Sequence, residues 1–299
     1  MPKSSVEEQP VIWLQAATCT GCSVSVLNSV SPTIKNILID EVLPGKHVNL
    51  RYHATIMAGQ GEAVLKEMEQ TAKKSKGYIL VVEGALPTAA GGAFDTLGEK
   101  DGKPVPVIDY AEKLAKNALA IIALGTCASF GGIAAGAPNP SGSVSVDRFL
   151  NEHGIGTPLI NVPGCAPHPD WFVGTLASLL LKGLPKPEEL DEHKRPKAFY
   201  GKLIHENCPR RAYFDEGKFA KKFGDPGCMN ELGCKGPVTY SDCPTRSWNH
   251  GTNWPIGSGS PCIGCVEPGF PDLVSPFYQK LDDEALPAVG QGKGGQTSE

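Results

Sequence analysis

Ten cysteines constrain the folding of this 299-residue chain more than any other feature of its sequence. An even number of cysteines could form disulfides, as in many small secreted proteins. A chain of this length, however, can bury an apolar core without cross-links. Two pairs, Cys19 with Cys22 and Cys262 with Cys265, have the Cys-x-x-Cys spacing that is typical of metal and redox sites. We therefore expect the cysteines to bind metal rather than to pair with one another.

Charge and hydropathy argue against binding to nucleic acids and against association with membranes. The formal net charge is -4, which gives no basic footprint for a nucleic acid or an anionic membrane surface. No apolar run approaches the ~18 residues that a membrane-spanning helix needs, so we expect no membrane span. The polar segment Met1–Pro10 contains neither an arginine pair nor an apolar stretch, so we expect no export signal in it.

Between Val11 and about Leu184, short apolar runs alternate with amphipathic stretches. The apolar runs are β-rich and bounded by chain-breaking residues, which predicts buried strands at Val11–Gln15, Asn49–His53, Tyr78–Val82, Leu119–Leu124 and Pro158–Val162. The amphipathic stretches predict helices at Gly61–Lys76, Tyr110–Asn117, Val146–His153 and Trp171–Lys182. Strands separated by helices form parallel sheets. Residues 11–185 are therefore predicted to be an α/β domain with a flavodoxin-like, doubly wound parallel sheet.

The sequence changes character after Leu184. Lys186–Pro196 is charged and contains prolines, and beyond it Pro, Gly, Asn and Cys dominate up to about Tyr278 with little periodicity. Such a segment cannot build a conventional apolar core. We therefore expect bound metal to stabilise an irregular C-terminal domain over residues 186–280. Residues 1–10 and the Gly- and Gln-rich residues 281–299 are predicted to be flexible.

Four cysteines follow predicted strands of the sheet. Cys19 and Cys22 come after the first strand, and Cys127 and Cys165 come after the last two. Because the carboxyl ends of parallel strands meet at one edge of a sheet, these cysteines are predicted to converge. Four thiolates suit zinc or a cubane iron–sulfur cluster. Two alternatives are buried structural cysteines and a nucleotide-binding crevice, although the first loop lacks the hydroxyl residues that a phosphate would require.

The C-terminal segment contains a second and a third set of metal-binding side chains. His205, Cys208, Cys228 and Cys234 supply one imidazole and three thiolates, which suit zinc or a four-iron cluster. A lone histidine is more often a surface or core residue, but the i, i+3 spacing to Cys208 favours a ligand. Cys243, Cys262 and Cys265 supply three thiolates, for a three-iron cluster or for a four-ligand site completed elsewhere.

These motifs resemble those of the small, iron–sulfur subunit of nickel–iron hydrogenases. The resemblance extends from Trp13 to Gln279 and rests on WLQ-x-x-x-CTGC, TIMAGQGE, VVEGALP, GTCASFGG, VPGCAPHPDW, IHENCP, GCKGP, the PCIGC series and SPFYQ. A single Cys-x-x-Cys would not be specific, but together these motifs are.

The resemblance implies an electron-transfer chain of three iron–sulfur clusters. A proximal 4Fe–4S cluster would be bound by Cys19, Cys22, Cys127 and Cys165, a distal 4Fe–4S cluster by His205, Cys208, Cys228 and Cys234, and a medial 3Fe–4S cluster by Cys243, Cys262 and Cys265. Glu83, at the end of a strand, would lie near the proximal cluster, with a solvated or capping carboxylate as the alternative. Pro255 would lie near the medial cluster.

The resemblance also implies the reaction and the partners. The activity would be the reversible oxidation of H2 to two protons and two electrons, at a nickel–iron site in a large subunit. The partners would be that large subunit, in an obligate heterodimer or a dimer of heterodimers, and an external electron carrier such as a cytochrome or a ferredoxin. Family resemblance suggests a mature periplasmic chain, whereas a native start at Met1 would suggest the cytoplasm.

Departures from the family pattern bear on the subtype. Gly21 and Gly132 stand where oxygen-tolerant relatives carry two extra cysteines, so a special three-iron proximal cluster is not expected. Pro255 stands where some selenium-containing relatives have a fourth medial cysteine. Thr18 and Val24 stand where many relatives carry glutamates, so a proton path through these positions is not expected.

Two other functions are compatible with parts of the pattern. The first is an electron-transfer subunit of a quinone-linked dehydrogenase, which would share only the first four-cysteine site. The seven additional donors after Lys186 disfavour it. The second is a zinc-stabilised binding protein without a redox role.

Overall fold

In the computed structural model, which describes residues 6–40, 44–74 and 77–280, contacts divide the chain into two units, Met1–Pro187 and Glu188–Glu299. This division falls close to the predicted boundary at residue 185. The predicted flexible tail, residues 281–299, lies outside the described residues.

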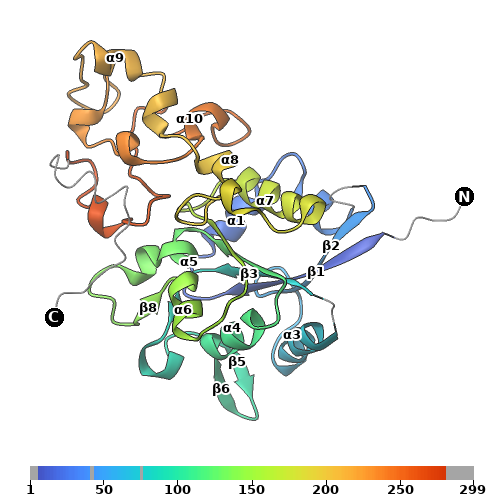
Figure 1. Cartoon of the computed structure of the whole chain (residues 1–299). Coiled ribbons are helices and arrows are strands. Elements are labelled where there is room, and N and C mark those ends of the chain that lie inside the picture. The colour runs from blue at the N-terminus through green and yellow to red at the C-terminus, as the bar shows by residue number, and fades with distance from the viewer. Residues whose placement is uncertain (1–5, 41–43, 75–76, 281–299) are drawn as a thin grey trace, which may run out of the picture. The chain divides into compact units, whose positions relative to one another are not determined.

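Within the described residues, the first unit is built on a five-stranded parallel sheet (Figure 1). Its strands are β1 (Glu7–Gln15), β2 (Lys46–His53), β3 (Ile79–Glu83), β7 (Ala120–Leu124) and β9 (Leu159–Val162), in the order β2-β1-β3-β7-β9. In register, Val11 lies opposite Ile79 of β3, and Ile79 lies opposite Ala120 of β7. This order is that of a flavodoxin-like doubly wound sheet. The predicted fold class is therefore confirmed.

Helices cover both faces of the sheet (Figure 1). They are α1 (Gly21–Leu27), α2 (Ile34–Leu38), α3 (Glu62–Lys74), α4 (Val107–Ala115), α5 (Thr126–Phe130), α6 (Val146–Glu152) and α7 (Pro169–Lys182), with the 3-10 helices η1 (Ala89–Gly92) and η2 (Gly132–Ala135). Alternate residues of β1 point to opposite faces. Ile12 and Leu14 belong to the core formed with α3, α4 and α6, whereas Trp13 packs on Phe172 of α7, with ring centroids 5.0 Å apart. Burial on both faces explains why the strands are continuously apolar.

Strand β1 begins earlier than predicted. Residues 7–10, which we expected to be part of a flexible N-terminus, pair with β2, and Glu7 lies opposite Lys46. The carboxylate of Glu7 forms an ion pair with the Lys46 ammonium, and Asn49 donates a hydrogen bond of 2.8 Å to Glu8. This part of the strand pairs with β2 at the edge of the sheet, where side chains are exposed to solvent. Its residues are therefore polar and lack the apolar pattern by which a buried strand is predicted.

Two small antiparallel pairs extend the first unit. β4 (Leu86–Pro87) pairs with β8 (Ser143–Val144), and β5 (Thr96–Lys100) forms a hairpin with β6 (Lys103–Pro106). The hairpin turns at Asp101 and Gly102, which both have positive φ, as a two-residue Asp-Gly turn requires. This hairpin was not predicted from the sequence.

The second unit is irregular, as predicted. Its described helices are η3 (Pro187–Glu189, at the boundary), α8 (Lys197–Tyr200), η4 (Ile204–Asn207), α9 (Arg211–Asp215), η5 (Asn230–Leu232), η6 (Gly236–Val238), α10 (Cys243–Arg246) and η7 (Asp272–Val274). A small apolar cluster forms around Phe270 and Val274, packed against Val238, Ile263 and Phe277. The described part of this unit thus contains short helical turns and no sheet of the kind found in the first.

A buried ion network stabilises the second unit. The Arg195 guanidinium is 2% exposed and contacts Asp191 at 2.7 Å and Glu267 at 3.1 Å. Glu267 also accepts a hydrogen bond of 2.7 Å from the backbone N–H of Tyr240. Arg195 lies in the charged segment Lys186–Pro196, which the sequence predicts to be a linker between the two domains, so part of that linker is an internal element of the second unit.

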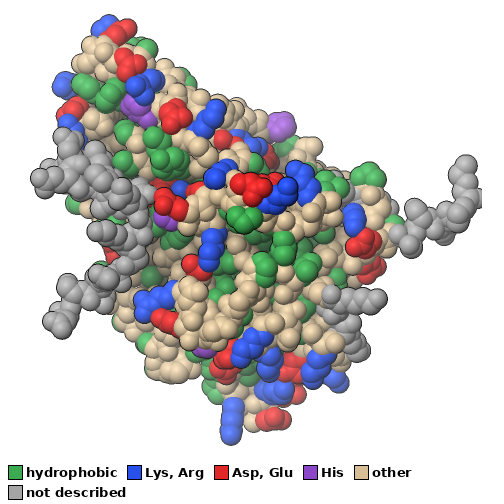
Figure 2. Space-filling view, in the orientation of Figure 1, with side chains coloured by type: hydrophobic (Ala, Val, Ile, Leu, Met, Phe, Trp, Pro, Cys, Tyr) green, Lys and Arg blue, Asp and Glu red, His purple; other side chains and the backbone are tan. Residues whose placement is uncertain are grey.

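None of the helices in residues 6–40, 44–74 and 77–280 combines the length and the apolar character that crossing a bilayer requires. On the face shown in Figure 2, basic and acidic side chains are interspersed rather than gathered by sign.

Candidate metal centres

The first cysteine group is formed by Cys19, Cys22, Cys127 and Cys165, each placed just beyond the carboxyl end of a strand. Cys19 and Cys22 flank the start of α1 after β1, Cys127 lies in α5 after β7, and Cys165 follows β9. Burial raises the pKa of the Cys22 thiol, and negative charge on Glu83 and on each of the other three cysteines raises it further. The structure therefore brings together the four cysteines that sheet topology predicted to converge.

Gly125 makes room for this group between β7 and α5. Its φ is +88°, and a side-chain carbon at this position would overlap the Cys22 sulfur. The neighbouring Thr126 fixes the loop after β9, because Gly164 donates a hydrogen bond of 2.8 Å to its hydroxyl. A residue larger than glycine could not occupy position 125 without moving a sulfur of the group.

Gly21 and Gly132 lie directly beside two other sulfurs. A Cβ on Gly21 would lie 3.1 Å from Cys19 Sγ, and one on Gly132 would lie 3.0 Å from Cys127 Sγ. The two positions at which the resemblance expects extra cysteines in oxygen-tolerant relatives are thus adjacent to the first group.

Glu83 is fully buried at the end of β3, so the alternative of a solvated carboxylate is wrong. Its carboxylate accepts hydrogen bonds from Trp13 Nε1 at 2.9 Å, from Thr18 Oγ1 at 3.2 Å and from the backbone N–H of Ser23 at 3.2 Å. The last of these N–H groups belongs to the first turn of α1, which carries Cys22. Glu83 therefore ties the first cysteine loop to the sheet and caps α1.

Ser23 and His53 extend this network and were not singled out from the sequence. The Ser23 hydroxyl donates to Glu83 Oε2 at 2.5 Å and lies 3.1 Å from His53 Nε2. Burial lowers the pKa of His53, although Glu83 opposes this effect. The position of His53 at the end of β2, at the same sheet edge as the cysteines, is the signal that could have identified it.

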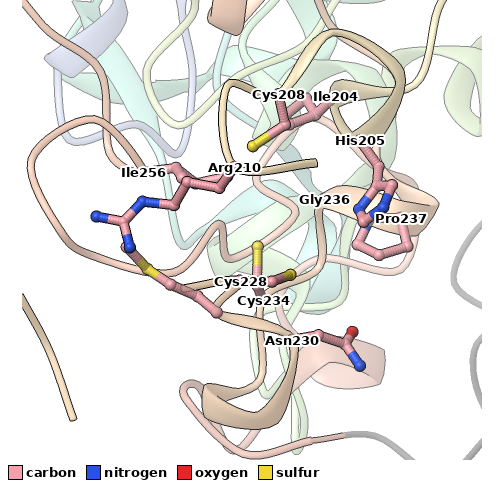
Figure 3. Close-up of a pocket in the computed structure, with 11 residues that line it drawn as sticks. Ile204, His205, Cys208, Arg210, Cys228, Asn230, Cys234, Gly236, Pro237 and Ile256 are labelled. Atoms are coloured by element: carbon pink, nitrogen blue, oxygen red, sulfur yellow. The ribbon is translucent and has the colours of Figure 1, made fainter. Parts of the chain in front are cut away.

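The second group lines a pocket in the second unit (Figure 3). His205 lies in η4, Cys208 ends that helix, and Cys228 and Cys234 flank η5. Figure 3 shows the sulfurs of the three cysteines pointing into the common space. Arg210 also lines the cavity. The structure thus brings together the predicted imidazole and three thiolates.

The His205 ring is held in place by aromatic packing. It lies edge-to-face against Phe214 of α9, with ring centroids 4.7 Å apart. Burial lowers the pKa of His205, and the positive charge of Arg211 lowers it further. The imidazole is therefore kept neutral at neutral pH, which is the form that binds metal.

The third group is formed by Cys243, at the start of α10, with Cys262 and Cys265. Burial raises the pKa of Cys262 well above its ordinary value, and Cys234, Cys265 and Cys243 raise it further. The hydroxyl of Ser241 lies 3.1 Å from Cys243 Sγ. The three predicted cysteines therefore lie within electrostatic range of one another.

The second and third groups adjoin within the second unit. Burial raises the pKa of Cys234 to about 11, and its surroundings include Cys208 and Cys228 of the second group and the backbone N–H of Cys262. Lys235 lies between the groups. Burial lowers its pKa, although the negative charges of Cys234 and Cys262 oppose this effect. This lysine was not singled out from the sequence.

Pro255 lies in a turn between the buried Trp254 and Ile256, and Ile256 lines the cavity of the second group. Pro255 itself is exposed, so its placement beside the third group stays a prediction.

Donor chemistry decides what these groups can bind. All ten cysteines are free, so the structure contains none of the disulfides considered as an alternative. Within the described residues, no three His, Cys, Asp or Glu side chains are arranged to hold a single metal ion. Four thiolates, or three with an imidazole, are donor sets suited to iron–sulfur clusters. The residues present therefore fit such clusters.

Comparisons with known proteins cover both units. Residues 19–179 match the family model for the NADH ubiquinone oxidoreductase 20 Kd subunit, and residues 200–278 match the model for the C-terminal part of the NiFe/NiFeSe hydrogenase small subunit. The periplasmic [NiFeSe] hydrogenase small subunit of Desulfomicrobium baculatum is 48% identical, over 91% of this chain and 87% of that protein. The periplasmic [NiFe] hydrogenase small subunit of Solidesulfovibrio fructosivorans is 42% identical, over 90% and 81%. The structure of a reduced, active Ni–Fe–Se hydrogenase from D. baculatum superposes with a TM-score of 0.86 at 46% identity, covering 92% of this chain and 100% of that one.

Proposed function

Because the chain belongs to the family of nickel–iron hydrogenase small subunits, we propose that its three groups of cysteines hold the clusters through which electrons leave or reach the active site. The family consists of electron-transfer subunits of an oxidoreductase that acts on H2, and the catalytic site is in the large subunit. This chain is accordingly the electron-transfer subunit, and the reaction it serves is the interconversion of H2 with two protons and two electrons.

The donor sets support one assignment of cluster types. The first group would hold the proximal 4Fe–4S cluster and the second group the distal one. The third group, with three thiolates, would hold the medial 3Fe–4S cluster. When bound, the clusters supply one-electron redox chemistry. The chain's own residues fix the sulfurs, exclude water and set the local charge, and these are the factors that tune reduction potentials.

One observation carries this proposal: all ten cysteines and His205 fall into three groups of converging donors, with no thiol left over. The contact between the second and third groups at Cys234 and Cys262 supports a short electron hop between them. The neutral His205 imidazole gives the second group one less negative charge than four thiolates would. That difference should raise the potential of the terminal cluster.

The partners follow from the same assignment. The large subunit would cover the first group in an obligate heterodimer, as single copies or as a dimer of heterodimers, and the interface would exceed roughly 2,000 Å². An external carrier such as a cytochrome or a ferredoxin would dock near the second group. We place the complex in the periplasm, because two similar relatives are periplasmic hydrogenase subunits. None of the relatives described above supports the cytoplasmic alternative.

The match of residues 19–179 to a quinone oxidoreductase subunit does not favour that function. It covers the first group only, whereas residues 200–278, which carry the second and third groups, match the hydrogenase small-subunit model.

Purification of the complex tests the proposed function. A tagged copy of this chain should copurify with a nickel-bearing large subunit, and H2 should bleach its broad visible absorbance by reducing the clusters. Cys208→Ser should leave H2-dependent bleaching of the other clusters but slow the reduction of an external dye. A colourless chain that contains zinc and no iron would overturn the proposal.

A further inference from the structure

Lys235 is a buried lysine at the junction of two metal-binding groups. Its side chain is 1% exposed. It follows Cys234 of the second group directly in the chain, and its backbone N–H donates a hydrogen bond of 2.8 Å to the carbonyl of Cys262 in the third. A Cβ on Gly264, inside the Cys262–Cys265 motif, would lie 3.4 Å from Lys235 Cβ. The backbone and the Cβ of Lys235 are thus fixed beside both groups.

The Lys235 ammonium has only neutral hydrogen-bond acceptors among the described residues. Its Nζ donates to the carbonyl of Gly233 at 2.9 Å and to the carbonyl of Gln279 at 2.7 Å. No ion pair joins it to a carboxylate in residues 6–40, 44–74 and 77–280. Two carbonyl dipoles do not neutralise a full charge, and a buried charge without a counter-charge is strongly unfavourable.

Arg195, a second buried cation of this unit, differs from Lys235 in having carboxylate partners. Its guanidinium is 2% exposed, nearly as buried as Lys235, and it contacts the carboxylates of Asp191 and Glu267. Lys235 differs from Arg195 in that the thiols of Cys234 and Cys262, and no carboxylate, are the groups whose negative charge acts on its ammonium among the described residues. The counter-charge that no carboxylate of the described residues gives to Lys235 can be supplied by the thiolates of Cys234 and Cys262 when they bind metal.

We propose that the Lys235 ammonium is a fixed positive charge shared by the second and third cysteine groups, and that it raises the reduction potentials of the clusters bound by both. This proposal rests on the ligand assignment given under Proposed function. A nearby cation favours the reduced form of a cluster, because reduction adds negative charge. One charge between two groups shifts both reduction potentials in the same direction. The difference between the two potentials, which drives electron transfer from one cluster to the other, therefore changes little.

Replacement of Lys235 in the assembled complex tests the proposal. Lys235→Met removes the charge at similar volume, Lys235→Gln keeps a hydrogen-bond donor without the charge, and Lys235→Arg keeps the charge. Lys222→Met removes an exposed lysine of the same unit and is the matched control. The readout is a redox titration of each cluster signal by EPR, together with iron content.

We expect the methionine and glutamine variants to lower both midpoint potentials. At a fixed potential, the reduced-to-oxidised ratio of each cluster should fall roughly tenfold, which corresponds to about 59 mV for a one-electron couple. The arginine variant and the Lys222→Met control should stay close to the parent protein. Unchanged potentials in both uncharged variants, with full iron content, would overturn the proposal.

Loss of clusters is also informative. If the methionine and glutamine variants lose iron at both groups while the arginine variant keeps it, positive charge is required at this position and the proposal stands. If the glutamine variant assembles with parent-like potentials, hydrogen bonding alone explains Lys235 and the proposal fails. If the parent complex lacks iron at these groups, the ligand assignment fails instead.

Discussion

Different interactions stabilise the interior of each of the two units. The first buries continuous apolar strands between two layers of helices, and its four cysteines lie just beyond the carboxyl ends of those strands. The second has a small apolar cluster around Phe270 and Val274, short helical turns, a buried ion network and two cysteine groups. We therefore expect the proposed clusters to be additions to a folded core in the first unit but part of the core in the second.

Removal of iron should reveal the largest difference in stability between the two units. Structural metal sites contribute about 10 kcal/mol or more to folding, and the second unit has little else to replace that contribution. Chelation of iron from the complex should abolish amide protection over residues 188–280 and leave strands β1, β3 and β7 protected. Hydrogen–deuterium exchange measured by mass spectrometry would show this. Equal loss of protection in both units would contradict the comparison.

A buried charge should matter more in the second unit than exposed charges do elsewhere. Arg195→Met leaves the carboxylate of Glu267, which is fully buried, without its cation. We expect the second unit to lose about 3–5 kcal/mol of stability, measured by denaturation of the iron-loaded complex.

The exposed Arg148–Glu152 pair on α6 is the control. Arg148→Met should cost no more than about 1 kcal/mol. A similar loss in both variants would show that burial of Arg195 is unimportant.

Gly125→Ala tests whether the cysteines of the first unit are additions to a finished core. The new Cβ would overlap the Cys22 sulfur, and alanine at φ +88° is strained by about 1–3 kcal/mol. We expect the sheet to stay folded, as seen by circular dichroism, while the proximal cluster signal is lost. Gly154→Ala is the matched control, because Gly154 also has a positive φ, +62°, but has no atom within 4 Å of the added carbon. Its cluster signal should be retained.

His205 should have the smallest effect on stability and a clear effect on electron transfer. His205→Cys replaces a neutral imidazole with a thiolate, so the distal cluster should persist with a lower potential and should pass electrons to an external dye more slowly. His205→Gly should slow dye reduction further. H2–deuterium exchange, which needs only the large-subunit site, should continue in both variants. Unchanged dye reduction in both would show that His205 is not a ligand.

Sequence was most informative where apolar patterning decides structure. The predicted strand Tyr78–Val82 is found as β3 (Ile79–Glu83), and the predicted helix Trp171–Lys182 is α7, which begins two residues earlier. That earlier start comes from His168, whose side chain accepts the N–H of Asp170, with Pro169 in the first turn. Convergence of the first cysteine group followed from sheet topology alone.

Features that depend on distant contacts could not be predicted. Glu83 was singled out from the sequence, but Ser23, which donates to it, lies in α1, and His53, which contacts Ser23, lies at the end of β2. Lys235 resembles an ordinary surface lysine in the sequence, because one of the two carbonyls that its ammonium contacts belongs to Gln279, far along the chain. Nothing in residues 7–10 signals a strand, since its partner β2 supplies the pairing.

Selective loss of EPR signals tests the three-group assignment most directly. The oxidised complex should show one sharp signal from a three-iron centre, which Cys265→Ser should abolish and Cys208→Ser should leave in place. Iron content should fall in each variant by the iron of a single cluster. A complex with full iron content and no three-iron signal, or a signal that survives Cys265→Ser and disappears in Cys208→Ser, would contradict the assignment of the third group.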